Sequence, residues 1–480
     1  MGYNNMKEYD LIIVGTGSGM NYVGSILQQN PEMKIAVVDK DEPGGICLTR
    51  GCIPSKMLLY PAELVREIKS AQNFGISTKI EDIDFKSIMD RMRNAIHSDI
   101  ALIREGLESD DVLDYYHGVA QFIAPYTLEV GDETLKAPMI FLCTGSKPVV
   151  PPIEGLDSIA YLTSDEVLNM ESLPESLVIV GAGYIAAEYG HFFSAMGCKV
   201  TVIGNGPRVL QQEEPEISIL AKRKMEQYLD VHTGYRVVSV GENNGMKKVT
   251  AINSEGDEIS IEAAQILLAA GRTSNSDILH PDKGDIGTNE KGWIKVNENL
   301  ETTCKNVWAF GDCNGQQLFK HVGNYESTVV FQNAILRQDI MVNYHAVPHA
   351  VFSWPEIAGA GLSEAEAIES FGKESISIGF EEFENTGKGL AMDLHDYFVK
   401  VIIEDNSQQI LGVHIIGPQA SVLIHQVIPL MYVDGPQTHP LVHSMDIHPS
   451  LSEVVKRAFY SQYTIGEYHT ILKEKEFEKS

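Results

Sequence analysis

Two short apolar runs of this chain, Leu11–Val14 and Leu177–Val180, each lead directly into a glycine-rich turn. A buried strand that turns at glycines into a helix is typical of a dinucleotide-binding βαβ unit, in which the pyrophosphate rests on the helix N-terminus. This pattern limits the fold more than any other feature, because it requires a parallel sheet flanked by helices. Two such units predict an α/β protein with two Rossmann-like dinucleotide-binding domains.

The first turn contains three glycines, and each has its own use. Gly15 permits the tight turn, and Gly17 lets the backbone approach a pyrophosphate. The usual third glycine position holds Met20, and Gly19 beside it partly compensates. Asp39 ends the next apolar run, 24 residues after Gly15, where an acidic residue binds a ribose hydroxyl. These residues predict the first dinucleotide site.

The second turn repeats the arrangement with Gly181 and Gly183, and Ala186 stands at the third position, which the pattern tolerates. NAD-selective sites have an acid at the end of the following strand, but this chain has Gly204 there. Arg208 could pair with the 2′-phosphate of NADPH, although an ordinary solvated arginine is an equally good interpretation. The choice between NADH and NADPH therefore stays open, with a lean towards NADPH or dual use.

Two cysteines lie five residues apart in the glycine-rich segment that follows the first unit. Pro54 indicates the first turn of a helix, which places Cys52 near the positive end of a helix dipole. Lys56, on the same helical face, adds a positive charge that favours a thiolate. We therefore predict that Cys47 and Cys52 form a redox-active pair. No further Cys or His nearby has the spacing of a metal ligand, and we expect no metal site.

The length and charge of the chain limit its partners and its organisation. Its 480 residues suit about three or four domain-sized units. The net charge of −29 repels nucleic acid and anionic lipid, so we expect neither as a partner. No apolar run is long enough for a membrane span, and we therefore expect a cytoplasmic protein. The predicted units are a first nucleotide domain, a second nucleotide domain, a return to the first domain and an α+β domain, at 1–147, 148–272, 273–345 and 346–480.

Outside these motifs, the periodicity predicts three further segments. A helical stretch is expected from about Pro54 to Glu108, with amphipathic spacing in its second half. A β-rich segment is expected from about Tyr115 to Leu142. A helix is expected from about Ser421 to Val433, within the α+β domain.

The redox loop has the pattern GGxCxxxGCxPSK, and with it the chain resembles the class I pyridine nucleotide–disulfide oxidoreductases. This family includes dihydrolipoamide dehydrogenase, glutathione reductase, mycothione reductase and mercuric reductase. The resemblance implies bound FAD and NADH or NADPH. It implies that Asp312 binds the flavin ribityl chain and that Glu188 pairs with Lys56 near the flavin N5. It adds four cofactor-binding positions: Thr144, Gly145, Gly271 and Gly311.

The sequence from His448 to Glu453 is similar to the His-Pro…Glu motif of the same family. Thiol–disulfide exchange needs a group that takes and returns a proton near neutral pH, which suits histidine. Glu453 would orient its ring, whereas the rivals His439 and His443 have no acid five residues later. In the family this histidine reaches the disulfide of the other subunit, which implies a homodimer formed through the C-terminal domain. His321 is expected near the flavin pocket, with a structural or a functional role.

The predicted function is therefore NAD(P)H-dependent, FAD-dependent exchange of electrons with a small disulfide or dithiol. Dihydrolipoamide dehydrogenase and a reductase of a low-molecular-weight disulfide, of the mycothione or glutathione type, remain alternatives. A mercuric-reductase-like metal ion reductase fits less well, because the chain has no paired cysteine in its C-terminal segment. A flavoprotein that keeps the fold without disulfide chemistry is a further alternative.

Overall fold

The computed structural model describes residues 6–109 and 112–477, and it contains two parallel sheets of the predicted kind. The first sheet has the order β18-β8-β2-β3-β4, with all pairs parallel. Its strands are β2 (Leu11–Val14), β3 (Ile35–Asp39), β4 (Leu113–His117), β8 (Ile140–Leu142) and β18 (Val307–Ala309). Helices α1 (Val23–Gln29) and α8 (Lys320–Val330) pack against it. The predicted α/β fold is confirmed.

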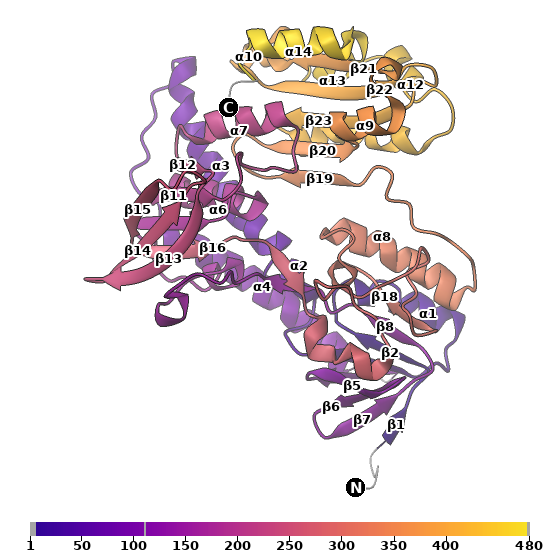
Figure 1. The fold of residues 1–480 in the computed structure, drawn as a ribbon. Coiled ribbons are helices and arrows are strands. Elements are labelled where there is room, and N and C mark those ends of the chain that lie inside the picture. The colour runs from indigo at the N-terminus through magenta and orange to yellow at the C-terminus, as the bar shows by residue number, and fades with distance from the viewer. Residues whose placement is uncertain (1–5, 110–111, 478–480) are drawn as a thin grey trace.

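The second parallel sheet has the order β12-β11-β10-β16. Its strands are β10 (Ser176–Val180), β11 (Lys199–Gly204), β12 (Asp230–Thr233) and β16 (Gln265–Leu268). Helices α6 (Tyr184–Met196) and α7 (Pro215–Met225) belong to this domain, with an antiparallel sheet of β13 (Arg236–Asn243), β14 (Met246–Ile252) and β15 (Glu258–Ala263). The chain then returns to the first sheet at β18, as Figure 1 shows. The boundaries at 147, 272 and 345 stay predictions.

The C-terminal region is an antiparallel sheet of order β19-β20-β23-β22-β21-β24 with helices beside it. Strands β22 (Phe398–Glu404) and β23 (Ile410–Ile416) are buried along their whole length. The remaining elements are β19 (Pro348–Val351), β20 (Ile357–Gly361), β21 (Ile376–Glu382), β24 (Gln462–Tyr463), α9 (Glu364–Phe371), α12 (His439–His443), α13 (Glu453–Tyr460) and α14 (Ile465–Glu474). The predicted α+β domain is confirmed, and it lies at the top of Figure 1.

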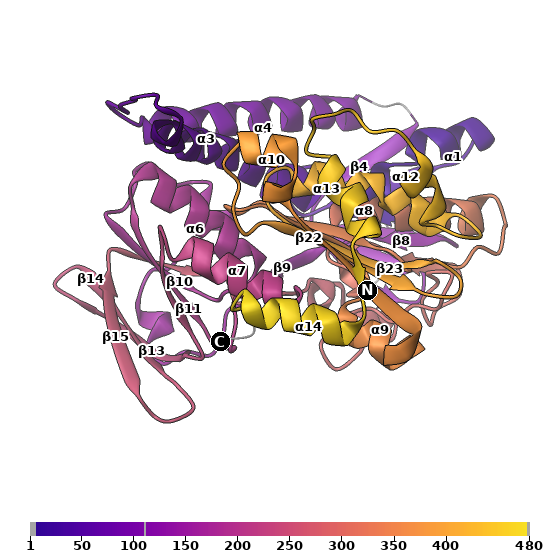
Figure 2. The ribbon, with the colours of Figure 1, turned by 90° about the horizontal axis from the view of Figure 1, so that it is seen from above.

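The helical stretch predicted from Pro54 to Glu108 is two helices, which run side by side in Figure 2. Helix α3 (Cys52–Ser70) continues as a short 3-10 turn that ends at Gly75, whose φ is +76°. Helix α4 (Phe85–Glu108) begins after Asp84, whose side chain accepts a hydrogen bond from the Ser87 amide. A left-handed glycine stops one helix and an aspartate cap starts the next, so a continuous helix was wrong.

The remaining two predictions have opposite outcomes. The β-rich segment is confirmed by β5 (Ala120–Ala124), β6 (Thr127–Val130) and β7 (Glu133–Lys136), which form a sheet of order β1-β7-β6-β5 with β1 (Met6–Glu8). The helix predicted from Ser421 to Val433 is broken into α11 (Ala420–Leu423) and two 3-10 turns. Pro429 explains the break, because proline donates no amide hydrogen bond and disfavours helical geometry in the residue before it.

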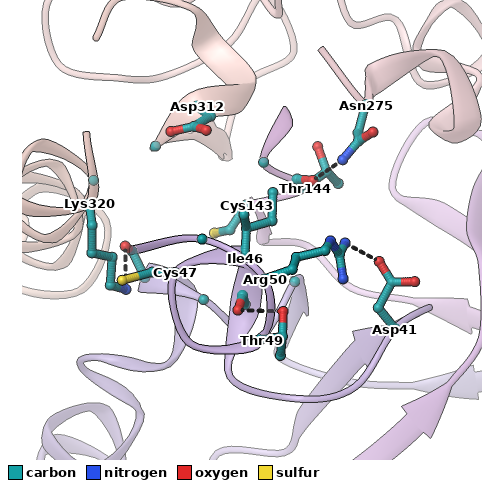
Figure 3. Close-up of a pocket in the computed structure, with 18 of the residues that line it drawn as sticks. Asp41, Ile46, Cys47, Thr49, Arg50, Cys143, Thr144, Asn275, Asp312 and Lys320 are labelled. Carbon is teal, nitrogen blue, oxygen red and sulfur yellow. Dashed lines mark hydrogen bonds and ion pairs between the residues drawn. The ribbon is translucent and has the colours of Figure 1, made fainter. Parts of the chain in front are cut away.

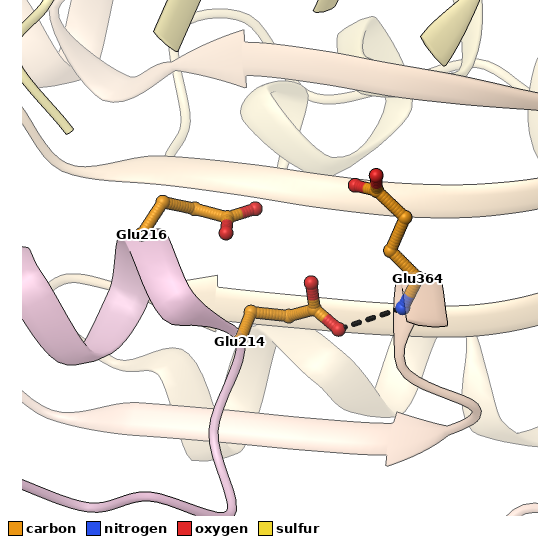
Figure 4. Close-up of side chains that lie close together, drawn as sticks. All are labelled: Glu214, Glu216 and Glu364. Atoms are coloured by element: carbon orange, nitrogen blue, oxygen red, sulfur yellow. Dashed lines mark hydrogen bonds between the residues drawn. The ribbon is translucent and has the colours of Figure 1, made fainter. Parts of the chain in front are cut away.

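A buried charge cluster joins the second nucleotide domain to the C-terminal sheet. Lys400 of β22 is fully buried, and its Nζ lies 2.6 Å from Glu214, 2.7 Å from Glu216 and 2.7 Å from Glu364. Figure 4 shows the three carboxylates converging, and the backbone amide of Glu364 also donates to Glu214 at 2.8 Å. The lysine ammonium supplies the cation on which these acids converge. We name these four residues the Lys400 cluster.

Within the described ranges, none of the helices combines the length and the apolar character that crossing a membrane requires.

Candidate active site

One cavity borders both the first glycine turn and the redox loop. It lies at the carboxyl ends of the strands of the first sheet, where open α/β sheets bind their ligands. The predicted site residues that line it are Gly15, Gly17, Asp39, Cys47, Cys52, Lys56, Thr144, Gly145, Glu188, Gly311 and Asp312. The predicted residues that do not line it are Gly19, Gly181, Gly183, Ala186, Arg208, Gly271, His448 and Glu453.

Glycines are needed at this turn because two backbone segments approach each other too closely for a side chain. A Cβ on Gly15, whose φ is +108°, would lie 2.2 Å from a backbone carbonyl oxygen, and one on Gly45 would lie 2.5 Å from the Cα of Gly17. Gly19 has a different use: a Cβ there would lie 2.9 Å from the side chain of Ile13, so this glycine permits close packing on the sheet. A turn with glycines at these two positions fits the pyrophosphate of a dinucleotide.

Asp39 is held in place at the end of β3. One carboxylate oxygen accepts hydrogen bonds from the Thr16 amide at 2.8 Å and the Thr16 hydroxyl at 2.5 Å, and the other accepts from the Asp41 amide at 3.0 Å. Sequence reasoning missed Thr16, although its place between Gly15 and Gly17 was the available signal. The carboxylate is thereby oriented towards the cavity that it lines.

The two cysteine thiols are free and hydrogen-bonded to each other. Cys47 lies in α2 (Gly45–Thr49), and Cys52 is the first residue of α3. A hydrogen bond from Cys47, with help from the Lys56 ammonium, lowers the pKa of Cys52 to about 7, although burial and Glu188 oppose the change. The same hydrogen bond and burial raise the pKa of Cys47 above its usual range. The hydrogen bond between the two thiols thus favours the thiolate form on Cys52 rather than on Cys47.

Lys56 and Glu188 connect the redox helix to the second nucleotide domain. Lys56 Nζ lies 2.8 Å from both carboxylate oxygens of Glu188, which comes from α6. The Phe352 amide donates to the same carboxylate at 3.1 Å, and Lys56 Nζ lies 4.6 Å from the centre of the Phe352 ring. The pair implied by the resemblance is therefore formed at the cavity wall.

Arg50 was missed by sequence reasoning, and it fixes the redox loop from the other side. Its guanidinium lies 2.5 Å from Asp41, as Figure 3 shows, and 3.2 Å from Asp165 in the second nucleotide domain. Two carboxylates from different parts of the chain therefore hold the loop between the cysteines.

The opposite wall of the cavity offers polar groups to a ligand. Asp312 accepts a hydrogen bond from the Ser146 hydroxyl at 2.5 Å, and Arg272 donates to the same hydroxyl at 2.7 Å. The carbonyl of Thr144 accepts from Asn275 at 2.9 Å, but its buried hydroxyl has no hydrogen-bond partner among the described residues (Figure 3). A buried hydroxyl without a partner fits a cavity that a polar cofactor completes.

The second glycine turn has the same backbone geometry as the first, but the strand that follows it ends in Gly204 and not in an acidic residue. A Cβ on Gly181, whose φ is +123°, would lie 2.2 Å from a backbone carbonyl oxygen. A Cβ on Gly204 would lie 2.6 Å from the side chain of Ala182, so an acidic residue does not fit there unless the turn shifts. Arg208 is half-buried, and its buried Nε has no hydrogen-bond partner in the described parts of the chain. These features fit a nucleotide with an additional phosphate.

Comparison with known proteins agrees with this arrangement. A family model described as pyridine nucleotide-disulphide oxidoreductase matches residues 9–348, and the dimerisation domain model of the same family matches residues 347–459. The chain belongs to the pyridine nucleotide-disulphide oxidoreductase family.

Curated relatives of this oxidoreductase share about a third of its residues. Mycothione reductase of Mycobacterium tuberculosis H37Rv is 34% identical over 466 residues, which cover 94% of this chain and 99% of the relative. Dihydrolipoyl dehydrogenase of Bacillus subtilis strain 168 is 32% identical over 475 residues, with 94% and 97% covered. The solved structure of the HOCl-induced flavoprotein disulfide reductase RclA from Escherichia coli has a TM-score of 0.83 at 24% identity, with 94% and 99% covered, which shows the shared fold.

In this oxidoreductase His448 lies in the C-terminal domain, away from the cavity lining. Its Nδ1 is 3.0 Å from Glu453, and its side chain is 70% exposed. The hydrogen bond to His448 and one from the Ser450 amide lower the pKa of Glu453. The rings of His439 and His443 contact each other in α12 at a tilt of 43°, and among the described residues neither has a carboxylate within ion-pair distance. The oriented and exposed histidine is thus His448.

His321 lies behind the cavity wall. Its Nε2 is 2.7 Å from the carbonyl oxygen of Pro348, and its ring stacks on Phe319, which lines the cavity. Burial lowers the pKa of His321. These contacts favour a structural role.

Proposed function

We propose that this chain is an FAD-dependent NAD(P)H:disulfide oxidoreductase in which Cys47 and Cys52 exchange electrons with a small disulfide. The observation that carries the proposal is the hydrogen-bonded thiol pair at a glycine-lined cavity, in which the thiolate form is favoured on Cys52. Six cysteines in 480 residues are too few for the dense disulfide framework of a small secreted domain, and we propose the cytoplasm.

The residues present fit two dinucleotides. FAD would be held by the glycine turn, Asp39, the unpaired Thr144 hydroxyl, Gly145, Gly311 and Asp312. The nicotinamide nucleotide would be held by Gly181, Gly183, Ala186, Arg208 and Gly271. When bound, FAD supplies two-electron chemistry that lets NAD(P)H return the Cys47–Cys52 disulfide to the dithiol.

The thiol chemistry follows from the positions of the protons. Cys47 loses its proton to a base, attacks one sulfur of the substrate disulfide and expels the other as a thiolate, which takes up that proton. Cys52 then attacks Cys47, so the second substrate sulfur leaves as a thiolate that solvent protonates. The protein ends with a Cys47–Cys52 disulfide, and two electrons have moved to the substrate.

We propose that the base is His448 of the partner subunit in a homodimer. The match to a dimerisation domain supports the dimer, and the exposure of His448 with its ring held by Glu453 supports the role. An exposed histidine that points away from its own cavity suits action on a second copy.

We propose a low-molecular-weight disulfide as substrate and NADPH as the donor. The unpaired Nε of Arg208 and the absence of space for an acid at Gly204 support NADPH. Dihydrolipoamide dehydrogenase activity is the second candidate, because several relatives that cover most of the chain have that name.

Steady-state kinetics of the purified protein separate the two candidates. NADH and NADPH are each paired with lipoamide and with a series of small-thiol disulfides. A kcat/KM for lipoamide with NADH on the order of 10⁵ M⁻¹s⁻¹ or more would make the second candidate correct. Fast NADPH-driven reduction of one small disulfide, with a loss of NADPH preference in Arg208→Ala, supports the first.

A further inference from the structure

Lys320 is a third charged group at the redox pair that the proposed chemistry has not used. It is the first residue of α8, and it lines the same cavity as both cysteines. Its Nζ donates to the Ser18 hydroxyl at 3.0 Å, and Figure 3 shows its side chain pointing into the cavity on the side of Cys47. The ammonium therefore lies between the glycine turn and the redox loop.

The two lysines at the redox pair differ in how their charge is balanced. Lys56 is paired with both oxygens of Glu188, whereas Lys320 has no carboxylate within ion-pair distance in the described ranges. Lys56 acts on Cys52, and the Lys320 ammonium lowers the pKa of Cys47 against the hydrogen bond and burial that raise it. Each sulfur thus lies in the electrostatic range of a different lysine, and the lysine that acts on Cys47 has no carboxylate partner among the described residues.

We propose that Lys320 is the counter-cation of Cys47, stabilising the thiolate that attacks the substrate disulfide. This rests on the proposed function, in which Cys47 must lose its proton although Cys52 beside it is already negative. A second thiolate at that position is repelled by the first, and a cation within electrostatic range offsets the repulsion. The proton leaves to His448 of the partner subunit, and the lysine keeps all its protons.

The charged and titratable groups around the pair come from several elements. Cys52 and Lys56 lie on α3, Glu188 on α6 and Lys320 on α8, and the Arg272 guanidinium lies within electrostatic range of Cys52. Replacing Cys52 with serine removes the coupled titration and leaves Lys320 as the cation that acts directly on Cys47.

The test measures the reactivity of Cys47 in holoenzyme carrying Cys52→Ser and reduced with dithiothreitol. Iodoacetamide alkylation of Cys47 is followed by peptide mass spectrometry against pH. Adding Lys320→Met should move the midpoint of the profile up by about one pH unit, which is an approximately tenfold loss of rate below the midpoint. Lys320→Arg should retain the original midpoint, and Lys69→Met on α3, outside the cavity lining, is the matched control.

Lys320→Gln separates charge from structure, because it can still hydrogen-bond to Ser18, and it should give the same shift as Lys320→Met. An unchanged midpoint in either variant overturns the proposal. Loss of FAD absorbance with an unchanged midpoint also overturns it, and makes Lys320 a cofactor-holding residue. A different result would refute the proposed function and leave this assignment intact. In that case the Cys52→Ser variants show the expected alkylation midpoints, but the wild-type protein shows no NAD(P)H-driven disulfide reduction.

Discussion

The redox cavity and the Lys400 cluster both place a lysine among carboxylates, but they complete the pairing to different degrees. Lys400 is fully buried, and three carboxylates surround its ammonium. Lys56 at the cavity is 36% exposed in its side chain and faces one carboxylate, while Lys320 faces none among the described residues. In the Lys400 cluster every charge is paired, and the cluster holds two domains together. At the cavity the lysines are only partly paired, so their charge can act on ligands and on the reacting sulfurs.

The difference has a physical reason. A buried ion is costly to desolvate, so a structural cluster must satisfy nearly every charge and donor that it buries. The acids around Lys400 raise the pKa of its ammonium despite burial, and Tyr468 donates a further hydrogen bond to Glu216 at 2.6 Å. A site that acts on ligands instead keeps groups such as the Thr144 hydroxyl without partners of their own.

The largest expected effect is on the cavity side of this comparison. Cys47→Ser should lower disulfide turnover on the order of 10³-fold or more, because the nucleophile is lost, while FAD stays bound. The free energy of unfolding should change by less than about 0.5 kcal/mol. Steady-state kinetics with thermal unfolding check both halves, and normal disulfide reduction by the variant would refute the scheme.

On the structural side, Lys400→Met should lower the free energy of unfolding by about 3–5 kcal/mol, because three carboxylates remain buried without their cation. Denaturant unfolding gives the value. Lys86→Met, which breaks an exposed pair with Asp90, is the matched control and should cost less than about 1 kcal/mol. Equal losses in the two variants would show that the cluster contributes no more than a surface pair.

The pairing of the cluster also predicts a pH dependence. Lys400 and Tyr468 hold the pKa of Glu216 below its usual value although burial opposes them. A lowered folded-state pKa contributes stability above the unfolded value of about 4.3, and this stability is lost as the pH falls through the folded-state pKa. Unfolding measured from neutral to acid pH should show this loss, and Glu216→Gln should flatten it. An equally steep profile in the variant would assign the acid sensitivity to other carboxylates.

The smallest effect sharpens the description of the cavity. Glu188→Gln removes a carboxylate that raises the pKa of Cys52, so this pKa should fall below about 7, by about one unit. The long-wavelength absorbance of the thiolate beside the flavin, titrated against pH in the reduced holoenzyme, reports this change. A midpoint that moves upwards would contradict the electrostatic arrangement described for Lys56 and Glu188.

Part of the site was predictable because it depends on short spacings. Cys47, Cys52 and Lys56 share one loop and one helix, and Gly15 to Asp39 is one strand–helix–strand unit, so local geometry places them. Helix limits were harder to predict from periodicity alone: Gly75 and Asp84 divide one predicted helix into two. Thr16 and Arg50 were missed because no pattern distinguishes them from ordinary loop residues.

The sequence by itself determined the α/β fold, the two strand–glycine-turn–helix units and the closeness of Cys47 to Cys52, because backbone periodicity and glycine turns act over a few residues. Only the tertiary structure decided which distant charges meet. Lys56 and Glu188 are 132 residues apart, and Lys400 and Glu214 are 186 apart. Lys320 lines the same cavity as Cys47 only because α8 packs against the first sheet. Such pairs depend on how the domains pack against each other. The number of residues between the partners therefore follows no recurring pattern that a sequence could reveal.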